Sequence, residues 1–215
     1  MDFARETADR TPLILTVPGL DNSGAGHWQS IWERERDDMV RVDLGAWDRP
    51  HRNSWVNRLN LAIRDAGRPV VLVAHSLGCH AVAWWAAMER PAYGNPVVGA
   101  LLVAPPEVDV APVDERLEPF GATPKGPLPF PSIIVASQDD PYIRFHRARR
   151  LAQFWGGRFA DAGAVGHINA ESGLGDWPFG QFLLRTLLGL TARASEGGHP
   201  ASTGGPVRAR IDLSA

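Results

Sequence analysis

Short apolar segments and longer helical patterns alternate along the middle of this chain. Six short runs are predicted as strands because they are mostly apolar or alternate between apolar and polar residues. They are Leu13–Val17, Val40–Leu44, Val70–Ala74, Val97–Ala104, Ser132–Ala136 and Arg158–Asp161.

Between these runs, apolar side chains recur at the three-to-four-residue spacing of an amphipathic or buried helix. The predicted helices are His27–Met39, Trp55–Ala66, Leu77–Met88, Phe145–Trp155 and Phe179–Leu190. Repeated strand–helix alternation predicts an α/β protein with a mostly parallel sheet and helices on both faces.

The alternating pattern occupies residues 12–190, which we interpret as one domain. Residues 1–11 form a polar extension, and residues 191–215 are rich in Gly, Ala, Ser, Pro and Arg, which predicts a mobile tail. Truncation after Leu190 is therefore expected to leave stability and activity nearly unchanged, unless the apolar Val207–Leu213 docks onto a neighbouring subunit. The proline-laden Pro105–Pro131 is a candidate for a small cap.

Composition narrows the functional classes. The chain has 215 residues, 44% of them hydrophobic and 21% charged, as in an ordinary globular domain. A formal net charge of -2 argues against nucleic acid or an anionic membrane as partner, and no apolar run is as long as a membrane span. The polar start lacks a secretory signal, and a single cysteine, Cys79, forms no internal disulfide, so a cytoplasmic location is expected.

Ser76 occupies the most informative position in the sequence. It lies on the turn between the strand Val70–Ala74 and the helix that begins at Leu77, with small residues at Ala74 and Gly78. A nucleophile elbow is built in this way, with the serine hydroxyl raised above the end of the sheet. The alternative is that Ser76 only caps the helix that follows it.

An acid and a base follow later strands. Asp139 and Asp140 come shortly after Ser132–Ala136, and His167 follows the last predicted strand. Because the carboxyl ends of parallel strands share one edge, these side chains should approach Ser76, and Ser–Asp–His is the chain order of the α/β-hydrolase triad. His75, by contrast, is expected to point away from the Ser76 pocket and to have a packing role.

Several local motifs, in order, resemble the α/β-hydrolases, specifically the small serine hydrolases related to bacterial YdeN and retinoblastoma-binding protein nine. The matching segments are Val17–Leu20, His27–Gln29, Ala74–Gly78, Asp139–Tyr142 and Gly166–Asn169. The resemblance spans roughly residues 12–190 and implies a compact six-stranded sheet in the order 2-1-3-4-5-6 with a small cap. It also favours Asp140, directly before a proline, as the triad acid, which leaves Asp139 as a turn-stabilising residue.

The remaining site residues follow from the chemistry. An oxyanion hole needs two backbone N–H groups, for which Leu77 and Leu20 are the candidates, and Gly19 allows the close approach that this requires. His27, Trp28 and Trp47 are predicted to line an apolar acyl pocket, although core packing explains the tryptophans equally well. The expected function is a serine hydrolase that cleaves a small acyl ester without a metal or organic cofactor.

Three other functional classes have weaker support in the sequence. The glycine-rich segment Gly19–Gly26 lacks the lysine of a phosphate loop, with Ala25 at that position, and it fails the spacing of a dinucleotide fingerprint. No Cys or His pair has the spacing of a zinc site. A non-catalytic protein-binding module on a hydrolase fold stays open as an alternative, with a partner that the sequence does not specify.

Overall fold

A single six-stranded sheet forms the centre of the protein. The computed structural model describes residues 11–196. The strands are β1 Leu13–Val17, β2 Met39–Arg41, β3 Val70–His75, β4 Val97–Val103, β5 Ser132–Ala136 and β6 Arg158–Asp161. All neighbouring strands are parallel, and their order is β2-β1-β3-β4-β5-β6, which confirms the expected sheet.

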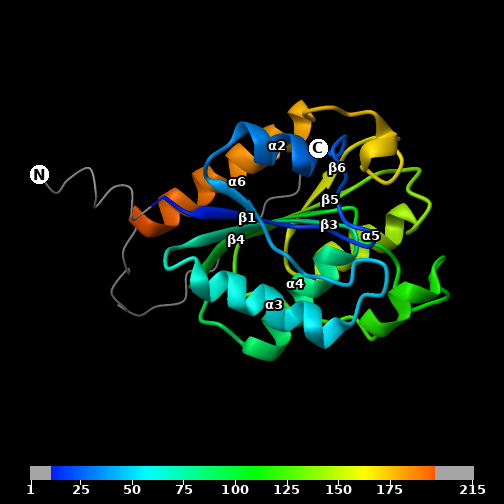
Figure 1. Cartoon of the computed structure of the whole chain (residues 1–215), viewed down its shortest axis with the longest axis horizontal. Helices are drawn as coiled ribbons and strands as arrows, with labels where there is room; N and C mark the ends of the chain where they lie inside the picture. Colours follow the sequence, from blue (N-terminus) through cyan, green and yellow to red (C-terminus); the bar gives the residue numbers. More distant parts are fainter. Residues whose placement is uncertain (1–10, 197–215) are drawn as a thin grey trace, which may run out of the picture.

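Helices cover both faces of this sheet (Figure 1). The helices are α2 Trp28–Glu35, α3 Arg52–Asp65, α4 Leu77–Glu89, α5 Phe145–Phe154 and α6 Pro178–Glu196, with short 3-10 helices η1 Glu115–Phe120 and η2 Ala170–Ser172. Side chains of α3, α4 and α5 share one hydrophobic cluster, and side chains of α2 and α6 share another.

The position of β3 inside the sheet explains why its sequence is almost entirely apolar. Every residue of β3 is buried, and successive side chains point to opposite faces of the sheet. Leu72 and Ala74 pack with α3 and α4, whereas Val71 and Val73 pack with α2 and α6. A strand buried on both faces has no place for a polar alternation.

The second strand begins one residue earlier and ends three residues earlier than predicted, and the preceding helix is shorter. α2 ends at Glu35, and Arg36 is extended and forms an ion pair of 2.7 Å with Asp38. This frees Met39 to pair with Ile14 of β1, so β2 is Met39–Arg41 instead of Val40–Leu44. Pairing with β1 therefore sets the boundary that the apolar pattern placed too late.

The proline-rich segment between β4 and β5 forms η1 and irregular loops that lie over α3 and α4. Phe120 is fully buried against Trp55, and its carbonyl accepts a hydrogen bond of 2.7 Å from Trp84 Nε1. Arg116 pairs with Asp114 at 2.7 Å and with Asp21 of the loop after β1 at 3.0 Å. The segment is thus attached both to the helical layer and to the loop beside Ser76.

The last helix is longer than its apolar pattern indicated. α6 continues to Glu196, so the predicted mobile tail beginning at residue 191 is wrong for its first six residues, 191–196. Thr191 is buried, its hydroxyl donates to the Leu188 carbonyl at 2.9 Å, and a Cβ at Gly99 of β4 would lie 3.0 Å from Thr191 Cγ2. Residues 1–10 and 197–215, including the apolar Val207–Leu213, lie outside the described residues.

Truncation after Leu190 is now expected to destabilise the protein relative to truncation after Glu196. The shorter chain loses the last turns of α6 and the buried Thr191 beside Gly99. Loss of about 1–2 kcal/mol should lower the melting temperature by about 2–8 °C. Thermal unfolding of the two truncated chains, side by side, measures the difference, and equal melting temperatures would contradict it.

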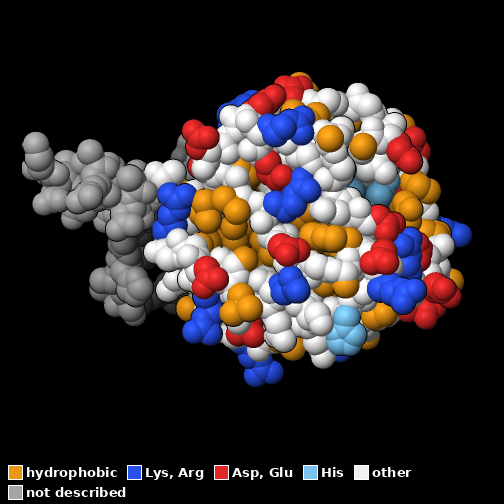
Figure 2. Space-filling model, in the orientation of Figure 1, with side chains coloured by type: hydrophobic (Ala, Val, Ile, Leu, Met, Phe, Trp, Pro, Cys, Tyr) orange, Lys and Arg blue, Asp and Glu red, His pale blue; other side chains and the backbone are white. Residues whose placement is uncertain are grey.

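The surface carries charges of both signs. Figure 2 shows acidic and basic side chains interspersed over one face, with hydrophobic side chains between them. Within residues 11–196, none of the helices combines the length and apolar character needed to span a membrane.

Candidate active site

Ser76 sits on a sharp corner between β3 and α4. Its backbone has φ 53° and ψ -127°, outside the conformations that a serine ordinarily adopts. The strain is held by neighbouring structure, since the Ser76 amide donates to the Val103 carbonyl at 2.9 Å. Ser76 makes no side-chain capping bond to α4, so the interpretation as a simple helix cap is wrong.

Glycines allow the close packing around this corner. A Cβ at Gly78 would lie 2.2 Å from the Val17 carbonyl oxygen and 2.6 Å from that of Pro18. A Cβ at Gly19 would lie 2.7 Å from Ser76 Cβ and 3.0 Å from the Leu77 amide nitrogen. The start of α4 is thus pressed against the end of β1, and only glycine fits at these two contacts.

Gly78→Ala is expected to destabilise the fold severely. Its methyl group would overlap backbone atoms of β1 and the loop after it, which cannot move aside as a flexible side chain can. We expect a loss of about 3 kcal/mol or more, measured by chemical denaturation. Gly126→Ala is the matched control, because a Cβ there meets nothing within 4 Å, and a fully stable Gly78→Ala would refute the contact.

The structure brings Ser76, His167 and Asp140 into one hydrogen-bonded chain. His167 Nε2 lies 2.9 Å from Ser76 Oγ, and Nδ1 lies 2.9 Å from both carboxylate oxygens of Asp140. Asp140 Oδ1 also accepts a bond of 2.9 Å from the Tyr142 amide. All three side chains are buried, and each reaches the others from the carboxyl end of a different strand. An Nδ1–H that donates to Asp140 leaves Nε2 as the acceptor for the serine hydroxyl.

The Asp139 side chain makes different contacts from the local turn that was predicted for it. A local turn through its side chain needs the N–H two residues ahead, but that residue is Pro141, which has none. Instead, Asp139 Oδ1 accepts from Ser137 Oγ at 2.7 Å and from the Gly166 amide at 2.8 Å. The Ser137 hydroxyl and the Gly166 N–H lower the pKa of this carboxyl. Asp139 therefore ties the loop that carries His167 to the loop after β5.

Two aromatic side chains donate hydrogen bonds to backbone carbonyls of the loop that carries His167. His75 Nε2 donates to the His167 carbonyl at 2.9 Å, and the two rings lie 5.0 Å apart, so the expectation that His75 points away from the site is wrong. Trp28 Nε1 donates to the Ile168 carbonyl at 2.8 Å, where Ile168 holds the unusual φ of 50°. Burial, with contributions from His27 and His167, holds the pKa of His75 well below its usual value, so the ring is neutral at pH 7.

The predicted oxyanion residues lie beside Ser76. Leu20 follows Gly19, which contacts the elbow, and Leu77 is the first residue of α4. Neither amide donates a hydrogen bond to another group within residues 11–196. Leu20 lines the same cavity as Ser76, and an oxyanion hole requires N–H groups that are not already hydrogen-bonded within the protein.

Two polar residues to which the sequence assigned no role hold the loop between β1 and α2. Gln29 is fully buried, accepts from Ser23 Oγ at 2.7 Å and donates to the Val73 carbonyl at 2.9 Å. Arg41 donates to the Ser23 carbonyl at 2.9 Å and to Asn22 Oδ1 at 3.2 Å. The sequence signal for Gln29 was its place in the matching segment His27–Gln29, whereas Arg41 was marked only by its polarity within a predicted strand.

A cavity of about 290 Å³ opens at Ser76. Its lining is Leu20, Asp21, Asn22, Gly24, His27, His75, Ser76, Leu117, Tyr142, His167, Asn169, Ala170 and Glu171. Most of these residues are polar, which differs from the aromatic wall expected. Trp28 and Trp47 do not line the cavity: Trp28 packs between Trp32 and Trp177 in the core, and Trp47 packs against Trp55.

His27 is the predicted pocket residue that does line the cavity. Its Nδ1 accepts from the Gln29 amide at 3.1 Å and so caps α2. Burial, Arg41 and His167 together lower the pKa of His27 to about 4, so the ring is neutral at pH 7 and Nε2 carries the proton. This buried Nε2–H has no hydrogen-bond partner among the described residues.

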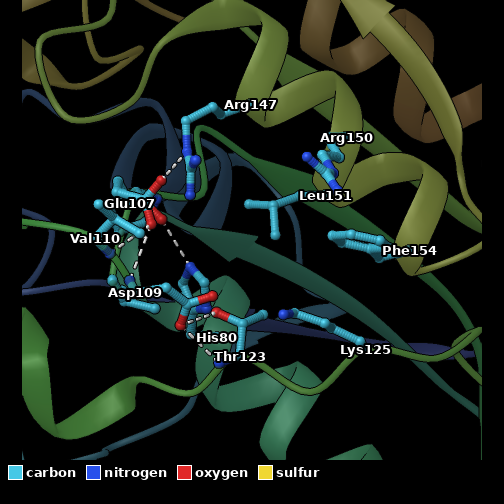
Figure 3. A pocket seen from close by; sticks show the side chains of 12 residues that line it. His80, Glu107, Asp109, Val110, Thr123, Lys125, Arg147, Arg150, Leu151 and Phe154 are labelled. Carbon is cyan, nitrogen blue, oxygen red and sulfur yellow. Dashed lines mark hydrogen bonds and ion pairs between the residues drawn. The ribbon is translucent and has the colours of Figure 1, made fainter.

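A second cavity, of about 240 Å³, lies between α4, α5 and the segment after β4 (Figure 3). Its acidic groups are already satisfied: Glu107 accepts from Arg147 and from the Asp109 amide, and Asp109 accepts from Thr123. Ser76, His167 and Asp140 do not line this second cavity. Among residues 11–196, no group of three or more His, Cys, Asp or Glu side chains could hold a metal ion.

The chain is similar to known serine hydrolases in sequence and in fold. The serine hydrolase family profile matches residues 14–186. A YdeN-like hydrolase from Pectobacterium atrosepticum has 31% sequence identity and a TM-score of 0.76, over 87% of this chain and 96% of the other.

Two further structures share the fold at lower identity. The ydeN gene product of Bacillus subtilis has 21% identity and a TM-score of 0.68, over 83% of this chain and 100% of the other. Est1E from Butyrivibrio proteoclasticus has 10% identity and a TM-score of 0.63, over 89% of this chain and 91% of the other. A comparison with curated proteins found no match.

Proposed function

Since the chain belongs to the serine hydrolase family, we propose that it cleaves small carboxylic esters with Ser76 as nucleophile, His167 as general base and Asp140 as orienting acid. The observation that carries this proposal is the continuous hydrogen-bonded chain from Ser76 Oγ through the His167 ring to Asp140, with 2.9 Å at each step. A nucleophile, a base within reach of it and a third group that orients the base are the requirements of acyl transfer.

The first half-reaction forms an acyl-enzyme. Ser76 Oγ attacks the ester carbonyl carbon while its proton passes to His167 Nε2, and the carbonyl π electrons move onto oxygen. The amides of Leu20 and Leu77 stabilise that oxyanion. As the carbonyl re-forms, the bond to the alcohol oxygen breaks, and the imidazolium returns its proton to the leaving alcohol. Asp140 stabilises the imidazolium while it is charged.

The second half-reaction regenerates the serine. Water attacks the acyl carbon and gives one proton to His167 Nε2, and the same two amides stabilise the second oxyanion. The bond from the acyl carbon to Ser76 Oγ then breaks, the acid departs, and the proton returns to the serine. The sum is hydrolysis of one ester by one water, so neither a metal nor an organic cofactor takes part in this proposal.

A fluorophosphonate probe tests the proposal most directly. It should label the protein covalently at Ser76, identified by peptide mass spectrometry, and p-nitrophenyl esters of graded acyl length should then rank the acyl preference. A protein that neither reacts with the probe nor hydrolyses any of these esters would support the alternative, a binding module on a hydrolase fold.

The size of the cavity indicates the class of substrate, and the cysteine content of the chain indicates the cellular location of the protein. We infer a small-molecule acyl substrate, because the cavity of about 290 Å³ is at the lower limit of small-molecule pockets. We infer a cytoplasmic location from the single cysteine, which forms no disulfide within the chain.

A further inference from the structure

The cavity at Ser76 is lined by both apolar and polar side chains. Leu20, Leu117 and the Tyr142 ring supply apolar surface. The loop that follows His167 supplies Asn169 and Glu171, and the loop after β1 supplies Asn22 and His27. An ester has two parts, acyl and alcohol, so the position of the reacting atoms decides which part meets the polar loops.

The proton path places the alcohol beside the histidine loop. In the proposed mechanism the alcohol oxygen takes its proton from His167 Nε2, which requires that oxygen to lie within hydrogen-bond reach of the ring. Asn169 and Glu171 follow His167 by two and four residues and line the same cavity. Asn169 and Glu171 are therefore the polar side chains of the histidine loop that are available to the alcohol portion of a bound ester.

These two residues present a donor and an acceptor that the described chain leaves unused. Asn169 Oδ1 accepts from the Glu171 amide at 3.1 Å, and this bond assigns the other end of the Asn169 side chain as the N–H₂ group. Neither that N–H₂ group nor the Glu171 carboxylate has a hydrogen bond or ion pair to another group in residues 11–196. A hydroxyl group can accept a hydrogen bond from the first and donate one to the second through a single oxygen atom.

The loop after β1 adds further donors. His27 Nε2–H is buried and has no partner among the described residues, although buried polar groups are normally satisfied. Asn22 Oδ1 is used by Arg41 and by the Ser23 amide, which leaves its N–H₂ group for a ligand. Two amide groups and an imidazole N–H together favour a substrate that is rich in oxygen acceptors.

We propose that the preferred substrates are esters of hydroxylated alcohols, such as glycerol or another polyol, whose free hydroxyl groups bind Asn169 and Glu171. This inference rests on the proposed ester hydrolysis at Ser76 and assigns the recognition of the alcohol to the loop after His167. The other interpretation of Glu171 is that its carboxylate attracts a cationic alcohol. The unused N–H groups of Asn169, Asn22 and His27 argue against a cation, because they would face it with further positive dipole ends.

The test compares esters that share one acyl group. 1-Monobutyrin and propyl butyrate have the same carbon skeleton and differ by two hydroxyl groups, and butyrylcholine carries a cation in place of them. Full-length protein is assayed with each ester by titration of the acid released. We expect kcat/KM for 1-monobutyrin to exceed that for propyl butyrate by about tenfold or more, because hydrogen bonds to a charged group contribute strongly to recognition.

Variants localise the effect. Glu171→Gln keeps the side-chain shape and removes the charge, and Asn169→Asp keeps the Oδ1 that binds the Glu171 amide and removes the N–H₂ donor. Each should lower the ratio of kcat/KM between 1-monobutyrin and propyl butyrate by about fivefold, since each removes one charged or donor contact to a hydroxyl. Glu89→Gln, at the exposed end of α4, is the matched control and should leave the ratio at its wild-type value.

The outcomes separate this inference from the proposed function. Equal kcat/KM for the two neutral esters, a higher value for butyrylcholine, or a ratio unchanged by both variants would overturn the hydroxylated-alcohol assignment and leave ester hydrolysis at Ser76 standing. Failure to hydrolyse any ester, with no fluorophosphonate label on Ser76, would overturn both.

Discussion

Ser76→Ala is expected to lower kcat for p-nitrophenyl esters by about 10⁶ and to abolish fluorophosphonate labelling. Alanine removes the oxygen that lies 2.9 Å from His167 Nε2 and would form the acyl-enzyme. The fold should persist, because the strained backbone is held by the hydrogen bond from the residue 76 amide to the Val103 carbonyl and by packing around Gly78, both of which alanine leaves intact.

The matched control is Ser132→Ala. Ser132 is buried on β5, and its Oγ has no hydrogen-bond partner among the described residues, so its removal should change neither turnover nor labelling. Thermal unfolding of both variants checks that the fold is retained. Turnover of Ser76→Ala at the wild-type rate would show that another group is the nucleophile.

Asp140→Asn is expected to lower kcat by about 10⁴, which is the loss that the same substitution of the orienting carboxylate causes in a serine protease triad. Asparagine would offer an amide to His167 Nδ1 and favour the wrong tautomer, with the proton on Nε2 facing Ser76. The Tyr142 amide can still donate to the Asn oxygen, so the loop after β5 should keep its shape. Steady-state kinetics with a p-nitrophenyl ester measures the loss.

Asp139→Asn is the neighbouring control for that experiment. Its side chain accepts hydrogen bonds from Ser137 Oγ and from the Gly166 amide, and the side-chain oxygen of an asparagine can accept both. We expect kcat to fall by less than about tenfold, through a slightly looser histidine loop. The reverse ranking of the two variants would move the triad acid to Asp139, and equally mild effects would remove both from the triad.

The two aspartates illustrate how adjacent residues acquire separate functions. Asp140 orients the His167 ring, and Asp139 holds the backbone at Gly166 immediately before it. Both bonds join the loop after β5 to the loop after β6. Substitutions at Asp139 should therefore act on His167 through its position, whereas those at Asp140 act on its tautomer and charge.

The apolar runs and their alternation with helical segments predicted the sheet and the order of the candidate triad. Apolar runs such as Val70–Ala74 can only be buried on both faces, and strand–helix alternation then enforces parallel strands whose carboxyl ends meet at one edge. Ser76, the pair Asp139 and Asp140, and His167 follow strands β3, β5 and β6, so chain order predicted their approach, and the resemblance to small serine hydrolases favoured Asp140 within the pair.

The orientations of the remaining side chains depend on contacts between segments that are distant in the sequence. Trp28 packs against Trp177, which lies near the other end of the domain in sequence, so no local pattern could place it in the core and away from the cavity. Likewise, His75 meets the carbonyl of His167, and the last turns of α6 are stabilised where Thr191 packs against Gly99 of β4. Periodicity reports which face of an element is apolar, but contacts between distant segments decide which buried side chains support the site and which line it.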